Sequence, residues 1–120
     1  MSYDPSNIFA RILLGELPCK KIAEDEHTLA FEDINPQAPV HILVIPKGSY
    51  VDWSDFTRNA PDVEQIAFTK MIGYVANIAG ITDSGYRVIS NSGNDGHQDV
   101  PHLHMHVLGG AAIGPMVSKR

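Results

Sequence analysis

Three histidines at alternating positions are the side chains of this sequence best suited to chemistry. They lie in the segment His102-Leu103-His104-Met105-His106, and the whole 120-residue chain contains six histidines. Near neutral pH an imidazole can serve as nucleophile, general acid or base, or metal ligand. Because residues two apart in a strand point to the same side, a strand here would place the three rings on one face and the apolar side chains between them in the core. The segment therefore predicts a row of titratable rings on one strand.

The residues alone leave three interpretations of this row open. The histidines could be polar residues on a solvated strand face. They could bind a metal, but Cα atoms of His102 and His106 would lie roughly 13 Å apart along the strand, so two rings and a further ligand such as His41 would be needed. They could also act in nucleophilic catalysis, with the central His104 as a neutral nucleophile, because a cationic neighbour lowers the pKa of an imidazole.

The pattern of apolar residues predicts the elements that must hold this strand. Two helices are expected where apolar residues recur at helical spacing, at residues 8–13 after Ser6 or Asn7 as N-cap and from Pro61 to Gly80. Five strands are expected at residues 20–24, 28–34, 40–45, 86–90 and 102–108, with a loop rich in Gly, Asn and Asp at 91–99.

The order of these elements predicts the fold class. Short links between most strands favour an antiparallel α+β fold with a sheet of about five strands and two helices over a doubly wound parallel sheet. Residues 40–45 are apolar on both faces and therefore predict a buried central strand, in which His41 is the exception. A length of 120 residues fits a single domain, with residues 111–120 as a C-terminal tail.

Composition and charge exclude several classes of function. Nine basic and fourteen acidic residues give a net charge of −5 and form no basic run, which disfavours binding to duplex nucleic acid. The longest aliphatic run, Ile42 to Ile45, is far too short to span a bilayer, and the first residues lack the pattern of a signal peptide. Cys19 is the single cysteine, so no disulfide forms within one chain. We therefore expect a cytoplasmic protein that does not bind membranes.

The histidine segment also resembles a known family. His102 to Leu108 matches the His-φ-His-φ-His-φ-φ signature of the histidine triad (HIT) proteins, where φ is apolar. The resemblance extends over practically the whole chain and is closest to the Hint branch of nucleoside phosphoramidases, with a tail at Gly114-Pro115-Met116 that looks bacterial. Further matching segments are Asn7-Ile8-Phe9, residues 31–39, residues 41–47 and Leu108-Gly109-Gly110.

This resemblance implies a role for each of four histidines. His104 matches the nucleophile that attacks the α-phosphorus of a nucleotide and forms a nucleotidyl-histidine intermediate, which water then hydrolyses. His106 matches a histidine that contacts the phosphate, and the backbone of His102 helps to orient the nucleophile. His41 is the fourth histidine of the family site. The family needs no metal and no cofactor for this chemistry.

The resemblance further implies a pocket for the nucleoside. Asp33 matches the carboxylate that accepts the ribose hydroxyls, a role that needs an ionised acceptor. By type alone, the apolar residues of this pocket could equally be ordinary core, and the glycines of the loop could be ordinary turn residues. The apolar walls around the base would be Ile8, Phe9, Ile12, Phe31 and Ile34, and the loop would contribute Asn91, Gly93, Gly96, Asp99 and Val100.

Asp99 departs from the pattern of many animal members, which carry a hydroxyl residue at this position. An ionised carboxylate only accepts hydrogen bonds and repels a phosphate, so an acid here needs a compensating cation. We expect it to support a protonated His106 or His102 that protonates the leaving nitrogen. The alternative is that Asp99 belongs to the turn before the strand and faces water.

The expected function is hydrolysis of the phosphorus–nitrogen bond in purine nucleoside 5′-phosphoramidates of the AMP or GMP type. Two alternatives stay open: a nucleotide-binding or scaffold protein with weak turnover, and a hydrolase or nucleotidyl transferase for dinucleoside polyphosphates. The resemblance also implies a homodimer, in which the long helix and an edge strand meet their symmetry mates to form a continuous sheet. The tail would then reach toward the partner's site.

Overall fold

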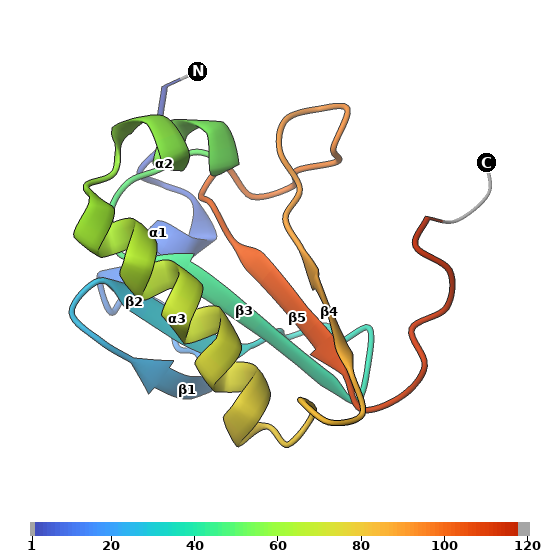
Figure 1. Ribbon diagram of the computed structural model, residues 1–120. Coiled ribbons are helices and arrows are strands. Elements are labelled where there is room, and N and C mark those ends of the chain that lie inside the picture. The colour runs from blue at the N-terminus through green and yellow to red at the C-terminus, as the bar shows by residue number, and fades with distance from the viewer. Residues whose placement is uncertain (1, 118–120) are drawn as a thin grey trace.

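The chain folds around one five-stranded antiparallel sheet with helices on both faces (Figure 1). The computed structural model describes residues 2–117. Neighbouring strands follow the order β1-β2-β3-β5-β4, and every pair is antiparallel. The elements are α1 (Ile8–Leu13), β1 (Lys21–Glu24), β2 (Thr28–Glu32), β3 (Val40–Pro46), α2 (Trp53–Asn59), α3 (Asp62–Ile78), β4 (Tyr86–Ile89) and β5 (Met105–Gly109). The predicted fold class is therefore confirmed.

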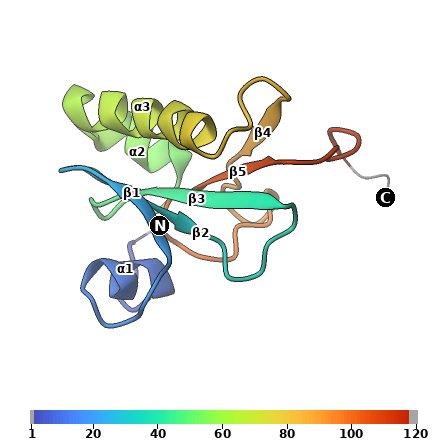
Figure 2. The ribbon, with the colours of Figure 1, turned by 90° about the horizontal axis from the view of Figure 1, so that it is seen from below.

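The molecule has three layers, with the sheet in the middle and helices on each of its two faces (Figure 2). Helices α2 and α3 cover one face, and the short helix α1 lies against the other (Figure 2). The core on the α3 side includes Phe56, Phe68 and Val75, whereas the core on the α1 side is smaller and is built around Phe9 and Phe31. The sheet thus presents a deeply covered face to α3 and a lightly covered face to α1.

Strand β3 lies at the centre of the sheet, as its apolar sequence predicts. It pairs with β2 on one side and with β5 on the other. Its side chains alternate between the two cores, because Ile42 and Val44 join the α3 side while Leu43 and Ile45 join the α1 side. His41 has the parity of Leu43, so β3 directs this histidine to the α1 side.

The prediction of two helices was wrong, because α2 is a third. Its N-cap is Asp52, whose side chain accepts a hydrogen bond from the backbone of Asp55, and its Phe56 is 1% exposed in the core. An aspartate followed three residues later by another acid, and then by a buried aromatic, is the signal of a helix start. The sequence therefore carries a local signal for the start of α2.

The last strand is also shorter than predicted, because β5 begins at Met105. The main chain leaves the ladder before that point, where the N–H of Leu103 donates to the carbonyl of Tyr50. The alternation of side chains nevertheless continues: Leu103 and Met105 pack in the α3-side core, and the histidines lie on the α1 side. Only His106 of the three histidines therefore stands on a strand, although all three share one side.

The segment after β5 has neither helix nor strand in its described part, residues 111–117. Arg87 of β4 holds it by donating to the carbonyls of Gly114 and Pro115 at 2.6 and 3.2 Å. Residues 118–120 of the predicted tail lie outside the described residues. Within residues 2–117, no helix is long and apolar enough to cross a membrane.

Candidate active site

His104 is held with one ring nitrogen protonated and the other free. Its side chain is buried, and Nδ1 lies 2.8 Å from the carbonyl oxygen of His102. A carbonyl only accepts, so Nδ1 carries the proton and donates it. In the neutral ring the lone pair therefore belongs to Nε2. The ring of Phe9 packs edge-on against this imidazole at 5.0 Å between centroids and fixes its plane.

His102 is completely buried, and both of its ring nitrogens have partners. Nε2 lies 2.9 Å from the carbonyl oxygen of Pro46, and Nδ1 lies 2.6 Å from the hydroxyl of Tyr3. Burial, with a smaller contribution from the charge of a protonated His104, lowers the pKa of His102 to about 4, against the opposing effect of the bond to the Pro46 carbonyl. His102 is therefore neutral at neutral pH, and its backbone makes the contact to His104 that the family resemblance implied.

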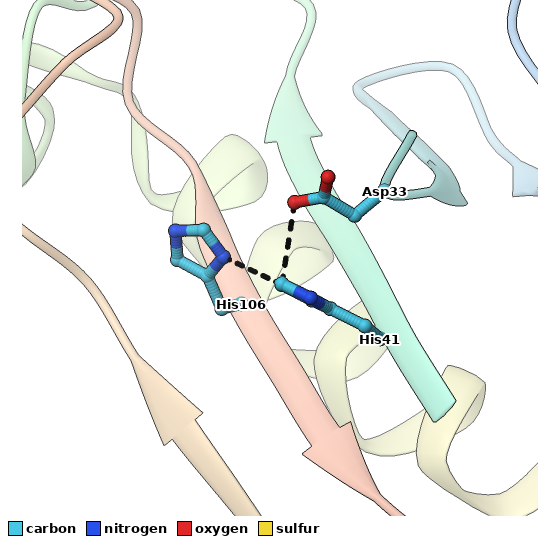
Figure 3. A group of neighbouring side chains, drawn as sticks. All are labelled: Asp33, His41 and His106. Atoms are coloured by element: carbon cyan, nitrogen blue, oxygen red, sulfur yellow. Dashed lines mark hydrogen bonds and ion pairs between the residues drawn. The ribbon is translucent and has the colours of Figure 1, made fainter. Parts of the chain in front are cut away.

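His41 and His106 form a second linked pair (Figure 3). The backbone N–H of Gln37 donates to Nδ1 of His41 at 3.0 Å, so the proton of His41 lies on Nε2. This Nε2 is 2.9 Å from Nδ1 of His106 and 3.3 Å from Oδ2 of Asp33. The Nε2–H of His41 therefore faces two acceptors, and the proton of a neutral His106 falls on its own Nε2.

Burial is also the main reason that His106 is neutral. Together with the charges that His104 and His41 carry when protonated, it lowers the pKa of His106 to about 4. Asp33 and Asp99 act in the opposite direction, with the smallest effects. Burial likewise lowers the pKa of His41, against the influence of Asp33.

The expected pairing of Asp99 with a cationic histidine is not supported. Both nitrogens of His102 are bound elsewhere, and His106 is neutral in the free protein. The carboxylate of Asp99 is 78% exposed, and its Oδ1 lies 4.0 Å from Nε2 of His104. Its negative charge therefore lies beside the free nitrogen of His104.

An open cleft of about 1100 Å³ reaches His41 and is lined from both faces of the sheet, by α1-side residues such as Ile8 and by Ile78 of α3. It is mainly apolar, with the carboxylate of Asp33 in its wall. A nucleoside, which has a flat apolar base and a polar sugar, matches this combination in size and chemistry. Of the predicted site residues, those lining the cleft are Ile8, Ile12, Phe31, Asp33, Ile34 and His41.

The remaining predicted residues lie at the rim of the cleft, outside it, or in the loop between β4 and β5. Ile34 is 92% exposed at the rim of the cleft, and Phe9 packs against Phe31 and the histidines rather than lining the cleft. In the loop, the side chain of Asn91 donates to the carbonyl of Gly96. Val100 packs against the α1-side core. The backbone N–H of Gly93 donates a hydrogen bond to the side-chain oxygen of Gln98.

A metal does not fit the cluster that has the ligand atoms for one. Within residues 2–117, ligand atoms of Asp33, His41 and His106 lie within 4.8 Å of one another. A metal on Nε2 of His41 would move the proton of that ring to Nδ1, where it would face the N–H of Gln37. Two donors would then oppose each other at 3.0 Å, so the backbone of Gln37 disfavours coordination.

Two contacts were not predicted from the sequence. Gln37 lies in the matching segment 31–39, but nothing in its type indicates that its backbone fixes the proton of His41. Tyr3 stands 99 residues before His102, and no spacing rule relates them. Such contacts depend on how distant segments meet, which a local pattern does not show.

The fold and the linked histidines define a protein of the histidine triad class, and comparisons with known proteins agree. The HIT domain family model matches residues 14–113. An uncharacterised 13.2 kDa HIT-like protein of Azospirillum brasilense is 58% identical over 98% of this chain and 97% of its own length. The purine nucleoside phosphoramidase of Escherichia coli K12 is 40% identical over 94% of each chain. The solved structure of a HIT family hydrolase from Legionella pneumophila is 37% identical, with a TM-score of 0.82 over 91% of this chain and 96% of that chain.

The chain therefore belongs to the HIT family and is a hydrolase of that family. The similarity to the Escherichia coli protein supports the Hint-type branch.

Proposed function

We propose that this protein hydrolyses the phosphorus–nitrogen bond of purine nucleoside 5′-phosphoramidates through a nucleotidyl intermediate on His104. The observation that carries the proposal is the bond from Nδ1 of His104 to the carbonyl of His102. It leaves Nε2 with the lone pair, which a nucleophile requires. The name of the Escherichia coli relative supports the choice of substrate.

The first step joins the nucleotide to the protein. The lone pair of His104 Nε2 attacks the α-phosphorus, and the electron pair of the phosphorus–nitrogen bond stays on the nitrogen. This nitrogen takes up one proton and leaves as an amine. We assign delivery of the proton to Nε2 of His106 in its cationic form, which the anionic phosphate of the bound substrate favours.

The second step releases the nucleotide. Water attacks the phosphorus and gives one proton back to Nε2 of His106, and the bond to His104 breaks. The products are a nucleoside monophosphate and the two histidines in their original states. A metal is not needed, because the neutral imidazole is itself the nucleophile and a phosphorus–imidazole bond is readily cleaved again.

Asp33 and the apolar cleft bind the nucleoside in this proposal. One oxygen of Asp33 accepts from the backbone of Asn35 at 2.8 Å, and the other lies near His41. An ionised carboxylate has about four acceptor positions, so it can accept the ribose hydroxyls in addition. Ile8, Ile12 and Phe31 then provide apolar surface for the base.

A comparison of substrates tests this function. We expect the purified protein to release an amine from adenosine 5′-phosphoramidates much faster than it cleaves diadenosine polyphosphates. Faster cleavage of the polyphosphates would replace the proposal by the dinucleoside hydrolase alternative. Binding of AMP without turnover of either substrate would replace it by a nucleotide-binding function.

A further inference from the structure

We propose that Tyr3 is a positioning residue of the active site, because its hydroxyl holds the ring of His102 and thereby the carbonyl that orients His104. The inference rests on the proposed function for its effect on turnover. The contact itself joins the segment before α1 to the segment before β5, and it lies behind the reacting nitrogen rather than in the cleft.

The contact between Tyr3 and His102 is close and shielded from water. The phenol oxygen lies 2.6 Å from Nδ1 of His102, and the two rings meet edge-on at 5.6 Å between centroids. His102 has no exposed surface. A buried nitrogen that loses its partner cannot bond to water instead, so removal of the hydroxyl leaves Nδ1 unsatisfied.

The two partners of His102 define which atom donates in each bond. Pro46 offers a carbonyl, which only accepts, so Nε2 of His102 carries the proton. The ring is neutral at neutral pH, so its Nδ1 is bare and accepts from the hydroxyl of Tyr3. A flipped ring would lose both bonds, and the pair of partners therefore permits one orientation.

The orientation of His102 passes directly to His104. The carbonyl of His102 accepts the Nδ1–H of His104 at 2.8 Å, and this bond places the lone pair of His104 on Nε2. The ring and the carbonyl belong to the same residue and are joined through Cβ and Cα, so a shift of the ring of His102 also shifts its carbonyl. His104 then samples rotations and the other tautomer, in which Nε2 is protonated and unable to attack.

The start of the chain is built to present Tyr3 at this place. Asn7 caps α1 by accepting from the backbone of Ala10, and its side-chain amide donates to the carbonyl of Asp4 at 2.7 Å. The turn before α1 is thereby fixed to the helix that carries Phe9. Phe9 packs against the rings of His102 and His104, so one N-terminal segment contacts both of these histidines.

The kinetic test compares Tyr3→Phe with the matched control Tyr50→Phe. Tyr50 also loses one hydroxyl bond, to Glu64 at 2.9 Å on α3, outside the site. We expect Tyr3→Phe to lower kcat by about ten-fold, the equivalent of one neutral hydrogen bond, with KM for the phosphoramidate changed less than about two-fold. The control should keep its kcat. An unchanged kcat in folded Tyr3→Phe protein would overturn the inference.

An NMR measurement of the imidazole nitrogens tests the inference without turnover. In the wild-type protein, correlation of ring protons with ¹⁵N should show His102 protonated on Nε2 with a hydrogen-bonded, bare Nδ1, and His104 protonated on Nδ1. In Tyr3→Phe, Nδ1 of His102 should move toward the position of a free acceptor, and the His104 signal should show exchange between tautomers. A proton on Nδ1 of His102 in the wild-type protein would overturn the inference even if the variant does not fold.

The two measurements separate this inference from the proposed function. If the wild-type protein shows no phosphoramidase activity but its nitrogens and those of Tyr3→Phe behave as described, the proposed function fails and the positioning role of Tyr3 stands. If the wild-type protein is active and the His104 signal is the same in both proteins, the proposed function stands and the role of Tyr3 fails.

Discussion

Each of the four histidines of the site has a ring nitrogen whose partner defines where a proton lies. Two of these partners are backbone carbonyls, one is a backbone amide, and one is another imidazole. Backbone groups do not change their donor or acceptor character with pH, so they fix tautomers more firmly than titratable side chains do. The pairs are Gln37 with His41, Pro46 with His102, His102 with His104, and His41 with His106.

This arrangement predicts turnover without a metal. Protein treated with EDTA and then freed of chelator should keep its full rate, because a neutral His104 needs no ion to act. Added zinc at stoichiometric amounts should not raise the rate, since the backbone of Gln37 keeps the proton of His41 on the nitrogen a metal would need. Loss of activity after chelation that zinc restores would show that the site is a metal centre.

The pKa of His102 also predicts how stability depends on pH. Burial lowers this pKa from about 6.5 in the unfolded chain to about 4 in the folded protein, so the unfolded chain binds more protons between these values. The stabilisation is complete above about pH 6.5 and is lost progressively as the pH falls toward 4. His102 alone should lower the free energy of unfolding by about 2 kcal/mol between about pH 7.5 and 5.

Urea unfolding at the two pH values measures this effect. The difference between them should shrink in His102→Gln, which cannot titrate, and should persist in the control His97→Gln, whose side chain is exposed in the loop. An equal pH dependence in wild-type protein and His102→Gln would show that His102 is not held neutral.

Among the elements, those with strong local signals were predicted well. The apolar run of β3 and the amphipathic α3, bounded by Pro61 and Gly80, are both present near their expected bounds. The missed helix α2 contains only two apolar residues, Trp53 and Phe56, so its sequence shows no recurring hydrophobic period. The start of β5 was misjudged because the alternation of side chains continues beyond the ladder, and alternation alone does not report hydrogen bonding.

The candidate site was also predicted only in part, because local patterns show which residues belong to it but not which distant residues bind them. The resemblance to the family, over several segments, supplied the four histidines and Asp33, and local alternation correctly placed the three histidines of the signature on one side. Their protonation depends on Gln37, Pro46 and Tyr3, which come from other segments. Such long-range contacts are consequences of the packed fold.

The charge of Asp99, in the loop between β4 and β5, should weaken the binding of an anionic substrate. Asp99 places its charge 4.0 Å from Nε2 of His104, where the anionic phosphate must approach. Asp99→Ser should therefore lower KM about two- to five-fold at low ionic strength, and salt at about 0.5 M should remove the difference, because the side chain is exposed and screened.

Asp95→Ser is the matched control, since Asp95 is exposed in the same loop and carries the same charge. It should leave KM nearly unchanged at every salt concentration. Equal effects of the two substitutions would mean that Asp99 acts only through the net charge of the loop.

At the scale of the whole molecule, the described residues 2–117 leave the β4 edge of the sheet without a strand partner and leave apolar side chains of α3 exposed. Strand β4 lies at the end of the sheet, and its Val88 is 41% exposed. Helix α3 exposes apolar side chains on its outer surface, among them Val63, Ile66 and Tyr74. An unpaired strand edge and exposed apolar side chains are each typical of a surface that pairs with a symmetry mate.

We therefore expect a homodimer in solution. Light scattering at micromolar concentration should report about 26 kDa, twice the 13.1 kDa of the chain. The substitution Val88→Lys on the edge strand β4 should yield a folded monomer, because two lysines that meet across a two-fold interface repel each other. A wild-type mass of a single chain would contradict the expected dimer.

The most direct measurement of the central claim is mass spectrometry of protein quenched during turnover of an adenosine 5′-phosphoramidate. The account predicts an AMP adduct on His104, because Nε2 of this ring carries the free lone pair. The adduct and the activity should be absent in His104→Asn, while AMP affinity should stay within a few-fold; the control His97→Asn, at a loop position with φ of 60° that asparagine tolerates, should retain both. An AMP adduct on another residue, or turnover by His104→Asn above about a hundredth of the wild-type rate, would contradict the assignment of His104 as the nucleophile.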